Sequence, residues 1–235
     1  MLGLGNNLKK GGLTTPGIIT DSLVLKHKYD AGSVAPVSDG AAYFDGTDDY
    51  IDLGSKANSG VDVSVTAWVK LTVSQVAPVI IFGDFMVRFQ DATDLRVWGD
   101  ISGTSSNVTV ESVLDKWTHI AVSSDNGVNS VYVNGALIEV ETDTASSTDA
   151  RASYIGRYSS DYFEGYICNV GLWSSTLTQA QIKSIMWKNY AGLTTGTGSE
   201  SENLVSWWNL DSSYIVGDVT HKTADSHGWN HGTLS

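Results

Sequence analysis

The chain has 235 residues, of which 41% are hydrophobic and 17% are charged, so it has enough apolar material for a packed core and is not expected to be disordered. Its formal net charge of −12 repels nucleic-acid phosphates and anionic lipids. We therefore expect neither nucleic acid nor a membrane as a partner. No apolar run is long enough to span a bilayer, and residues 1–10 do not have the apolar core of a signal peptide.

The beginning of the chain is expected to differ from the rest. Residues 1–20 are rich in glycine and show little periodicity, which predicts an extended arm that orders against a partner. A strand pattern begins at residue 22, where Leu23, Leu25 and His27 alternate with Val24, Lys26 and Lys28. We expect residues 21–235 to form a single domain.

Period-two patterns follow along the chain. Residues 61–69 alternate between valine or alanine and mostly polar residues, which predicts a half-buried strand with Trp68 on its less apolar face. In the next strands Phe85, Val87 and Phe89 share one face. Arg88, Arg96 and Trp98 fall on the opposite, less apolar faces.

Two local signals are stronger. Asn134-Gly135 between alternating runs predicts a type I′ hairpin that joins residues 128–133 to residues 136–140, because both turn positions require positive φ. One helix is expected over residues 179–190, with Thr178 as its N-cap and Gln181 as the capping-box partner. Residues 192–202 are interpreted as a flexible linker or loop.

Taken together, about ten short strands and one short helix predict an all-β fold, an antiparallel two-sheet sandwich. Cys168 is the single cysteine, which excludes an intrachain disulfide and a cysteine-based zinc site. Its strand-like neighbours predict a buried, inert thiol.

Three stretches resemble a known family. They are residues 43–51 with 65–70, residues 117–122 with 131–135, and residues 163–170 with Trp173 and 177–182. Their order and spacing resemble the laminin-G-like, concanavalin A-like jelly-roll family. The resemblance implies a jelly-roll sandwich, and it makes Ca²⁺ the one candidate cofactor because many members hold it. An acidic pair of the family pattern is replaced here by Cys168 and Asn169, which weakens the calcium inference.

The C-terminal segment, residues 204–235, carries a second resemblance. Residues 204–211 and 225–234 resemble the segment that usually opens this family, ahead of the Phe44-Asp45-Gly46 motif. One hypothesis is a partial circular permutation, in which residues 204–210 add a strand near the N-terminal strand and complete the sandwich. The other is that the segment begins a truncated second repeat and packs on a neighbouring subunit.

A glycan site is the first candidate for function. Sugar sites combine aromatic platforms with planar polar groups, and Trp68, Arg88, Arg96 and Trp98 could meet on one surface. A loop alternative is formed by Tyr158 and Tyr162, with Asp161 between them in sequence. The alternative to both is that a terminal segment or a partner chain covers these aromatic residues.

Acidic and histidine residues supply candidate metal and catalytic sites. Asp45 and Asp48 are candidate Ca²⁺ ligands, although the sequence favours a role for them as caps of the turn. A histidine-bearing tail, with His221, Asp225, His227 and His231, could bind a transition metal. Residues 139–143 (Glu-Val-Glu-Thr-Asp) come nearest to a glucanase motif, but the order of the acids is wrong, and no enzymatic activity is expected.

The opening residues 1–8 and 22–29 also resemble those of jelly-roll proteins from marine bacterial viruses. This resemblance predicts a non-enzymatic structural protein of the virion surface, as a capsid decoration or fibre. The arm would attach it to a capsid or tail protein, and such adornments are usually symmetric homo-oligomers. The alternative is an extracellular lectin module that binds a host-surface polysaccharide.

Overall fold

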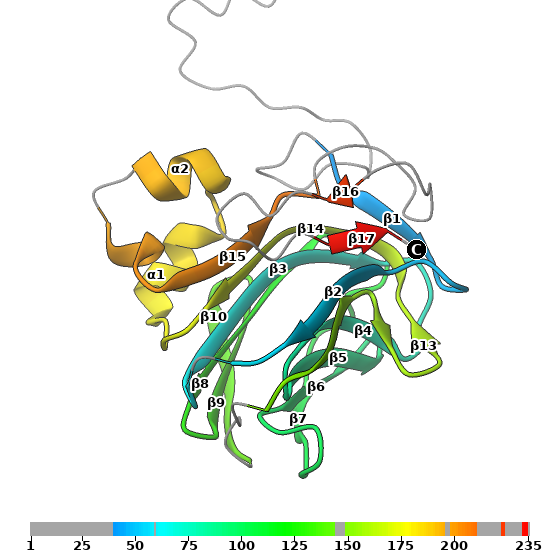
Figure 1. Cartoon of the computed structure of the whole chain (residues 1–235), viewed down its shortest axis with the longest axis horizontal. Helices are drawn as coiled ribbons and strands as arrows, with labels where there is room; N and C mark the ends of the chain where they lie inside the picture. The colour runs from blue at the N-terminus through cyan, green and yellow to red at the C-terminus, as the bar shows by residue number, and fades with distance from the viewer. Residues whose placement is uncertain are drawn as a thin grey trace, which may run out of the picture. The chain divides into compact units, whose positions relative to one another are not determined.

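The computed structural model describes residues 40–58, 60–143, 149–195 and 198–210, and the backbone of residues 222–223 and 232–234. These residues form two antiparallel sheets packed face to face (Figure 1). The prediction of an all-β, two-sheet jelly-roll sandwich is confirmed. The expected arm, residues 1–20, and the histidine-bearing tail lie outside the described residues.

The first sheet, sheet A, has the strand order β1-β14-β3-β8-β9-β10. A further strand, β15, pairs with β14 in line with β1. The strands are β1 Ala42–Asp45, β3 Val63–Leu71, β8 Thr118–Asp125, β9 Val128–Val133, β10 Ala136–Thr142, β14 Glu164–Trp173 and β15 Leu204–Trp208.

The second sheet, sheet B, has the order β16-β17-β2-β11-β4-β5-β6-β7. Its strands are β2 Ile51–Lys56, β4 Ala77–Phe82, β5 Phe85–Asp91, β6 Asp94–Trp98, β7 Ser106–Thr109, β11 Arg151–Ile155, β16 Lys222–Thr223 and β17 Gly232–Leu234. A separate two-stranded hairpin is formed by β12 Arg157–Tyr158 and β13 Asp161–Tyr162.

The main core lies between the two sheets. Phe85, Val87 and Phe89 are fully buried there, as their shared face predicts. Cys168 is also fully buried, and it lies opposite Trp68 of β3. Close packing also explains a glycine at the start of β14. A Cβ on Gly165 would lie 2.1 Å from the Lys70 carbonyl oxygen, and the φ of Gly165 is +138°, so a side chain there would separate β14 from β3.

A second apolar cluster covers the outer face of sheet A. Two short helices, α1 Gln179–Ile185 and α2 Tyr190–Thr195, and a 3₁₀ turn at Ser199–Ser201 follow β14. The cluster consists of Ala121, Tyr132, Trp173, Leu177, Ile182, Ile185, Leu193, Leu204 and Trp207. Strand β3 is therefore buried on both faces, and the prediction that this strand is half-buried was wrong.

The two strongest local signals are confirmed. Asn134 and Gly135 have φ values of +50° and +76° and join β9 to β10. Thr178 caps α1, and Gln181 completes the capping box. The helix ends at Ile185 rather than at residue 190, and α2 extends into the segment over residues 192–202 that was interpreted as a linker. Leu193 anchors that second helix because its side chain is fully buried.

The C-terminal segment contributes strands to both sheets. β15 pairs antiparallel with β14, with Val170 opposite Trp208, and the backbone of β17 pairs with β2. Trp207 and Trp208 point to opposite faces of sheet A, and both are buried. Trp208 lies in the main core and Trp207 in the cluster under the helices.

Candidate functional site

The outer face of sheet B carries two cross-strand rows of side chains. In the first row Tyr154 lies opposite Ile81, Ile81 opposite Met86, and Met86 opposite Trp98. In the second row Arg88 lies between Pro78 and Arg96, and Arg96 lies opposite Asn107. The face thus places an apolar row that ends in aromatic rings beside a row of arginines. We call it the arginine–aromatic surface, together with the β12–β13 hairpin and Tyr50.

Arg88 connects the two rows and the hairpin. Its guanidinium carbon lies 4.8 Å from the centre of the Trp98 ring. Arg88 Nη1 lies 3.4 Å from Asp161 Oδ2 of β13, and Arg88 Nη2 donates to Gln90 Oε1 at 3.2 Å. Only 16% of the side chain is exposed. These contacts fix the indole and the guanidinium relative to each other.

Arg96 forms an ion pair with Asp94. Arg96 lies directly opposite Arg88 in the ladder, a position at which two like charges repel each other. Asp94 Oδ2 accepts from Arg96 Nη2 at 3.1 Å, while Asp161 faces Arg88. The two acids offset the repulsion and hold the arginines in place.

A second arginine cluster lies at the hairpin. The guanidinium carbon of Arg157 is 4.5 Å from the ring centre of Tyr50, 5.3 Å from that of Tyr154 and 5.5 Å from that of Tyr162. The rings of Tyr50 and Tyr154 pack edge to face at 5.5 Å. Arg157 Nε donates to the Ser159 carbonyl oxygen at 3.2 Å. Among the described residues, no carboxylate forms an ion pair with Arg157.

Gly156 directs the chain into this hairpin. Its φ is +85°, and a Cβ there would lie 2.5 Å from Cε1 of the buried Phe44. Only glycine allows the backbone to pass so close to the core and then turn outward. The hairpin reverses at Ser159, which has a φ of +58°, and Tyr158 pairs with Asp161.

The structure brings together most of the predicted glycan-binding residues. Arg88, Arg96 and Trp98 lie on one face, and Tyr162 reaches it from the hairpin. The half-buried Tyr158 lies in the same hairpin. The sequence predicted two alternative glycan sites, one on the strands and one in a loop. In the structure both are parts of one surface.

Trp68 does not belong to this surface, and its placement there was wrong. It lies on β3 of sheet A and is only 4% exposed. Its indole nitrogen donates to the Met186 carbonyl oxygen at 3.1 Å, and its ring contacts His119 and Trp187. The segment at the end of α1 covers this part of sheet A, which the period-two pattern of β3 does not reveal.

Three residues of the surface were missed from the sequence. Tyr50 lies more than 100 positions before Tyr154 and Arg157 along the chain, and the three residues meet because β2 and β11 are neighbours. Alternation could have found Tyr154, since the next residue, Ile155, faces the core. Arg157 carries no such signal because it follows the turn at Gly156.

An acidic turn joins β1 of sheet A to β2 of sheet B. Asp45 Oδ1 accepts hydrogen bonds from the amides of Thr47 at 2.8 Å and Asp48 at 3.4 Å. Oxygen atoms of Asp45, Asp48 and Asp49 lie within 4.8 Å of one another. Asp49 is buried, and burial raises the pKa of its carboxyl to about 6. Capping of the turn is therefore observed, and the donor set also fits a hard cation such as Ca²⁺.

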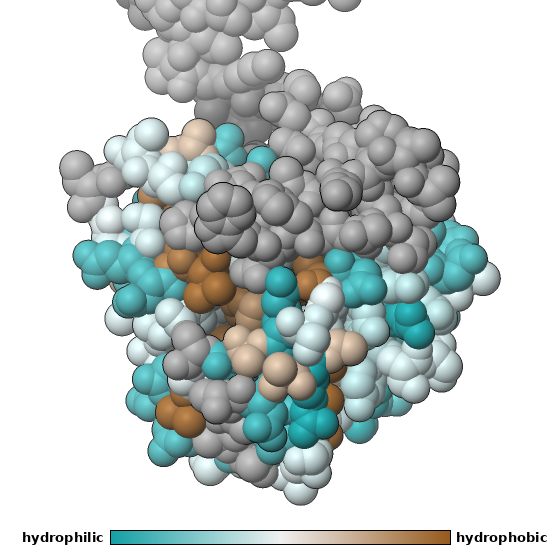
Figure 2. All heavy atoms as spheres, in the orientation of Figure 1, coloured by the Kyte–Doolittle hydropathy of each residue, from teal (hydrophilic) through white to brown (hydrophobic). Residues whose placement is uncertain are grey.

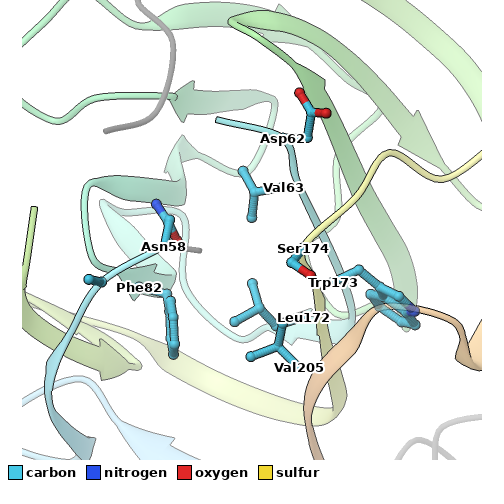
Figure 3. A pocket seen from close by; sticks show the side chains of 9 residues that line it. Asn58, Asp62, Val63, Phe82, Leu172, Trp173, Ser174 and Val205 are labelled. Atoms are coloured by element: carbon cyan, nitrogen blue, oxygen red, sulfur yellow. The ribbon is translucent and has the colours of Figure 1, made fainter. Parts of the chain in front are cut away.

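A small cavity lies at the opposite end of β2 (Figure 3). In this view the apolar side chains of Val63, Phe82, Leu172 and Val205 surround the space, and Asp62 lies at its margin. Hydrophobic residues also gather near the centre of the face shown in Figure 2. The cavity volume is about 70 Å³, whereas small-molecule sites measure roughly 300–1,000 Å³. It has room for water and not for a sugar ring.

The acidic stretch considered for catalysis forms most of β10, the edge strand of sheet A. It does not belong to the arginine–aromatic surface, which lies on the other sheet. Within the described part of the chain, no helix is long and apolar enough to cross a membrane.

Comparisons with known proteins agree with the fold. The structure of a protein from Bacteroides ovatus, named as a candidate carbohydrate-binding protein, has a TM-score of 0.60 and 24% identity and covers 82% of this chain. This chain covers 57% of that protein. A heptameric SAP-like pentraxin from Limulus polyphemus has a TM-score of 0.54 and 16% identity, with 61% of this chain and 80% of the pentraxin covered.

A search of curated proteins finds no match. A laminin-G-type family model, described as the concanavalin A-like lectin/glucanases superfamily, matches residues 45–183, more than half of the sequence. The chain belongs to the concanavalin A-like lectin/glucanase superfamily.

Proposed function

We propose that this protein is a non-enzymatic carbohydrate-binding module and that the arginine–aromatic surface is its sugar site. The observation that carries the proposal is the pair of guanidinium groups held on aromatic rings, Arg157 among three tyrosines and Arg88 on Trp98. The name of the Bacteroides ovatus protein, which also refers to carbohydrate, adds support.

The chemistry of the surface suits a sugar. The apolar faces of pyranose rings pack on aromatic side chains, and guanidinium N–H groups donate to hydroxyl oxygens in a fixed, planar arrangement. Arg88 and Arg96 project from paired strands of sheet B, so little conformational entropy is lost when a ligand binds. Arg157 has donors that are not committed to a carboxylate among the described residues.

The acids beside the arginines favour binding over turnover. Glycoside hydrolysis needs two carboxyl groups at a defined separation, one of them protonated as an acid. Asp94 and Asp161 instead form ion pairs with Arg96 and Arg88. They therefore position the arginines, and the proposed role is recognition without cleavage.

A glycan array tests this proposal. Labelled protein should bind a restricted set of glycans, and Arg157→Ala should lose most of that binding. Trp187→Ala is the matched control, because Trp187 is 58% exposed but belongs to the helix-covered side. An empty array for the wild-type protein, or equal binding by Arg157→Ala, would refute the site, and release of shorter sugars would refute the non-enzymatic role.

We further propose that the turn containing Asp45, Asp48 and Asp49 binds Ca²⁺. A cation would offset the mutual repulsion of these carboxylates, and it would bind most strongly when Asp49 is ionised, above a pH of about 6. Ca²⁺ should raise the melting temperature of the wild-type protein at pH 7.5, and EDTA should reverse the rise. Asp49→Asn should be insensitive to both; a calcium response of equal size in this variant would contradict the assignment.

A place on a virus particle is a separate proposal that rests on the sequence of residues 1–29. It concerns where the module works and leaves its sugar site unchanged. Immunogold labelling of particles purified from the source culture should decorate heads or tails regularly. Absence of label, with free protein in the medium, would favour an extracellular lectin.

A further inference from the structure

Arg157 differs from the other arginines of the chain. The sequence contains four arginines and 26 acidic residues. Three of the arginines form ion pairs, which are Arg88–Asp161, Arg96–Asp94 and Arg151–Asp84. Arg157 forms none within the described part of the chain. The arginine–aromatic surface thus contains one guanidinium whose charge no ion pair of the described residues offsets.

The surroundings of Arg157 hold its side chain and leave one edge of the guanidinium unused. Its carbon lies 4.5, 5.3 and 5.5 Å from the ring centres of Tyr50, Tyr154 and Tyr162. Nε donates to the Ser159 carbonyl oxygen, and no hydrogen bond of the described residues involves Nη1 or Nη2. The Nη1–Nη2 edge is one with which a guanidinium binds a carboxylate through parallel hydrogen bonds.

We propose that the arginine–aromatic surface recognises a sugar that carries a carboxylate, and that Arg157 binds this carboxylate. The inference rests on the proposed sugar site and names the class of sugar that it takes. A neutral sugar would displace water from the half-buried Arg157 without compensating its charge. A carboxylate compensates the charge, and its charge-assisted hydrogen bonds are roughly twice as strong as those to a neutral acceptor.

The acids near Arg157 limit how much negative charge a ligand can bring. Asp52 of β2 lies opposite Tyr154, and its Oδ1 accepts from the Gly54 amide at 2.7 Å. The acidic turn between β1 and β2 directly precedes Tyr50 in sequence. Together with the net charge of −12, these acids repel a glycan with a carboxylate on every unit. We therefore expect a single acidic unit in an otherwise neutral glycan.

An array of matched glycans tests the inference. Each glycan that carries one ring carboxylate is printed beside its carboxyl-reduced form, in which the carboxylate is a primary alcohol, and beside a sulfate-ester counterpart. In EDTA, the wild-type protein should bind at least one acid form about tenfold or more tightly than its reduced form. EDTA removes metal ions, so a cation at the acidic turn cannot bridge to the carboxylate.

Variants assign the preference to Arg157. Arg157→Gln keeps planar donors without the charge, so it should bind the acid and reduced forms alike. Arg157→Lys keeps the charge but not the paired donors, so it should retain part of the preference. The matched control is Asp94→Asn/Arg96→Gln, which removes an ion pair of the same surface and leaves the net charge unchanged. This control should keep the preference, and circular dichroism should show the same fold in every variant.

Several results would overturn the inference. They are equal binding of acid and reduced forms by the wild-type protein, a preference that persists in Arg157→Gln, a preference that disappears in EDTA, and tighter binding of the sulfate esters. If the wild-type protein binds glycans without regard to the carboxylate, the proposed sugar site stands and this inference fails. If it binds no glycan in any form, both fail.

Discussion

The outer faces of the two sheets use aromatic residues in opposite ways. On sheet A, Trp68, Trp173 and Trp207 are each less than 5% exposed. Their indole N–H groups donate to Met186 O, Glu200 O and Asn209 Oδ1. On sheet B, Trp98 and Tyr154 remain half-buried beside arginines. The covering of a face, and not the residue types on it, decides whether its aromatic side chains are packed into a core or remain partly exposed.

Ionisable groups also differ between the covered outer face of sheet A and the outer face of sheet B. On the covered side, burial lowers the pKa of His119 to about 3. Hydrogen bonds from Lys188 and Ser184 lower the pKa of the Glu200 carboxyl to about 2. At neutral pH His119 is therefore uncharged, and the Glu200 carboxylate is paired with Lys188. On the open side the arginines remain partly exposed, with side-chain exposures of 16% for Arg88 and 31% for Arg96.

The largest effect should come from removing a covered tryptophan. Trp173 is fully buried, and its Nε1 donates to the Glu200 carbonyl oxygen at 2.7 Å. Trp173→Ala should lower the free energy of unfolding by about 3–5 kcal/mol, measured by urea denaturation. The exposed Trp187 is the control, and its replacement by alanine should change stability by less than about 1 kcal/mol. Similar losses for both variants would contradict the division between covered and open positions.

The next effect concerns acid sensitivity of the covered side. The unfolded chain binds a proton at His119 near pH 6.5, whereas the folded chain does so only near pH 3. The folded pKa is depressed, so stability should fall as the pH drops from 6.5 toward 3. At pH 5 the loss due to His119 should be about 2 kcal/mol.

His119→Phe isolates this term, because other groups titrate alike in both proteins. The difference in unfolding free energy between variant and wild type should shift in favour of the variant between pH 7.5 and pH 5. A difference that does not change with pH would show that folded His119 accepts a proton normally.

The smallest effect is expected in affinity on the open side. Trp98→Ala removes the ring under Arg88 and should weaken sugar binding by about tenfold or more, roughly 1.4 kcal/mol, in calorimetric titration. Unfolding free energy should change less than it does in Trp173→Ala, because Trp98 is not in either apolar cluster. Unchanged affinity in Trp98→Ala would exclude the β5–β6 part of the site.

Local patterns were sufficient to predict much of the fold. The Asn134-Gly135 hairpin, the Thr178 cap and the core face of Phe85, Val87 and Phe89 depend on neighbours in sequence, and each was correctly predicted. The burial of Trp68 depends instead on Met186, which is 118 positions away. Alternation shows that Trp68 and Trp98 both lie on less apolar faces but not what covers either face.

The candidate site shows the same limit. Arg88 and Trp98 could be assigned to one face because β5 and β6 are consecutive strands. Tyr50 and Arg157 could not, since they are more than 100 positions apart and meet only through the pairing of β2 with β11. The turn at Gly156 interrupts the alternation of β11, so a period-two pattern does not predict which way the Arg157 side chain points.

Hydrogen–deuterium exchange with the best-binding glycan from the array tests the central claim most directly. Bound sugar should slow amide exchange in β5, in β6 and in the β12–β13 hairpin, and leave α1 and α2 unchanged. Protection confined to the helix-covered side of sheet A, or to the turn at Asp45–Asp49, would contradict the assignment of the open face of sheet B as the sugar site.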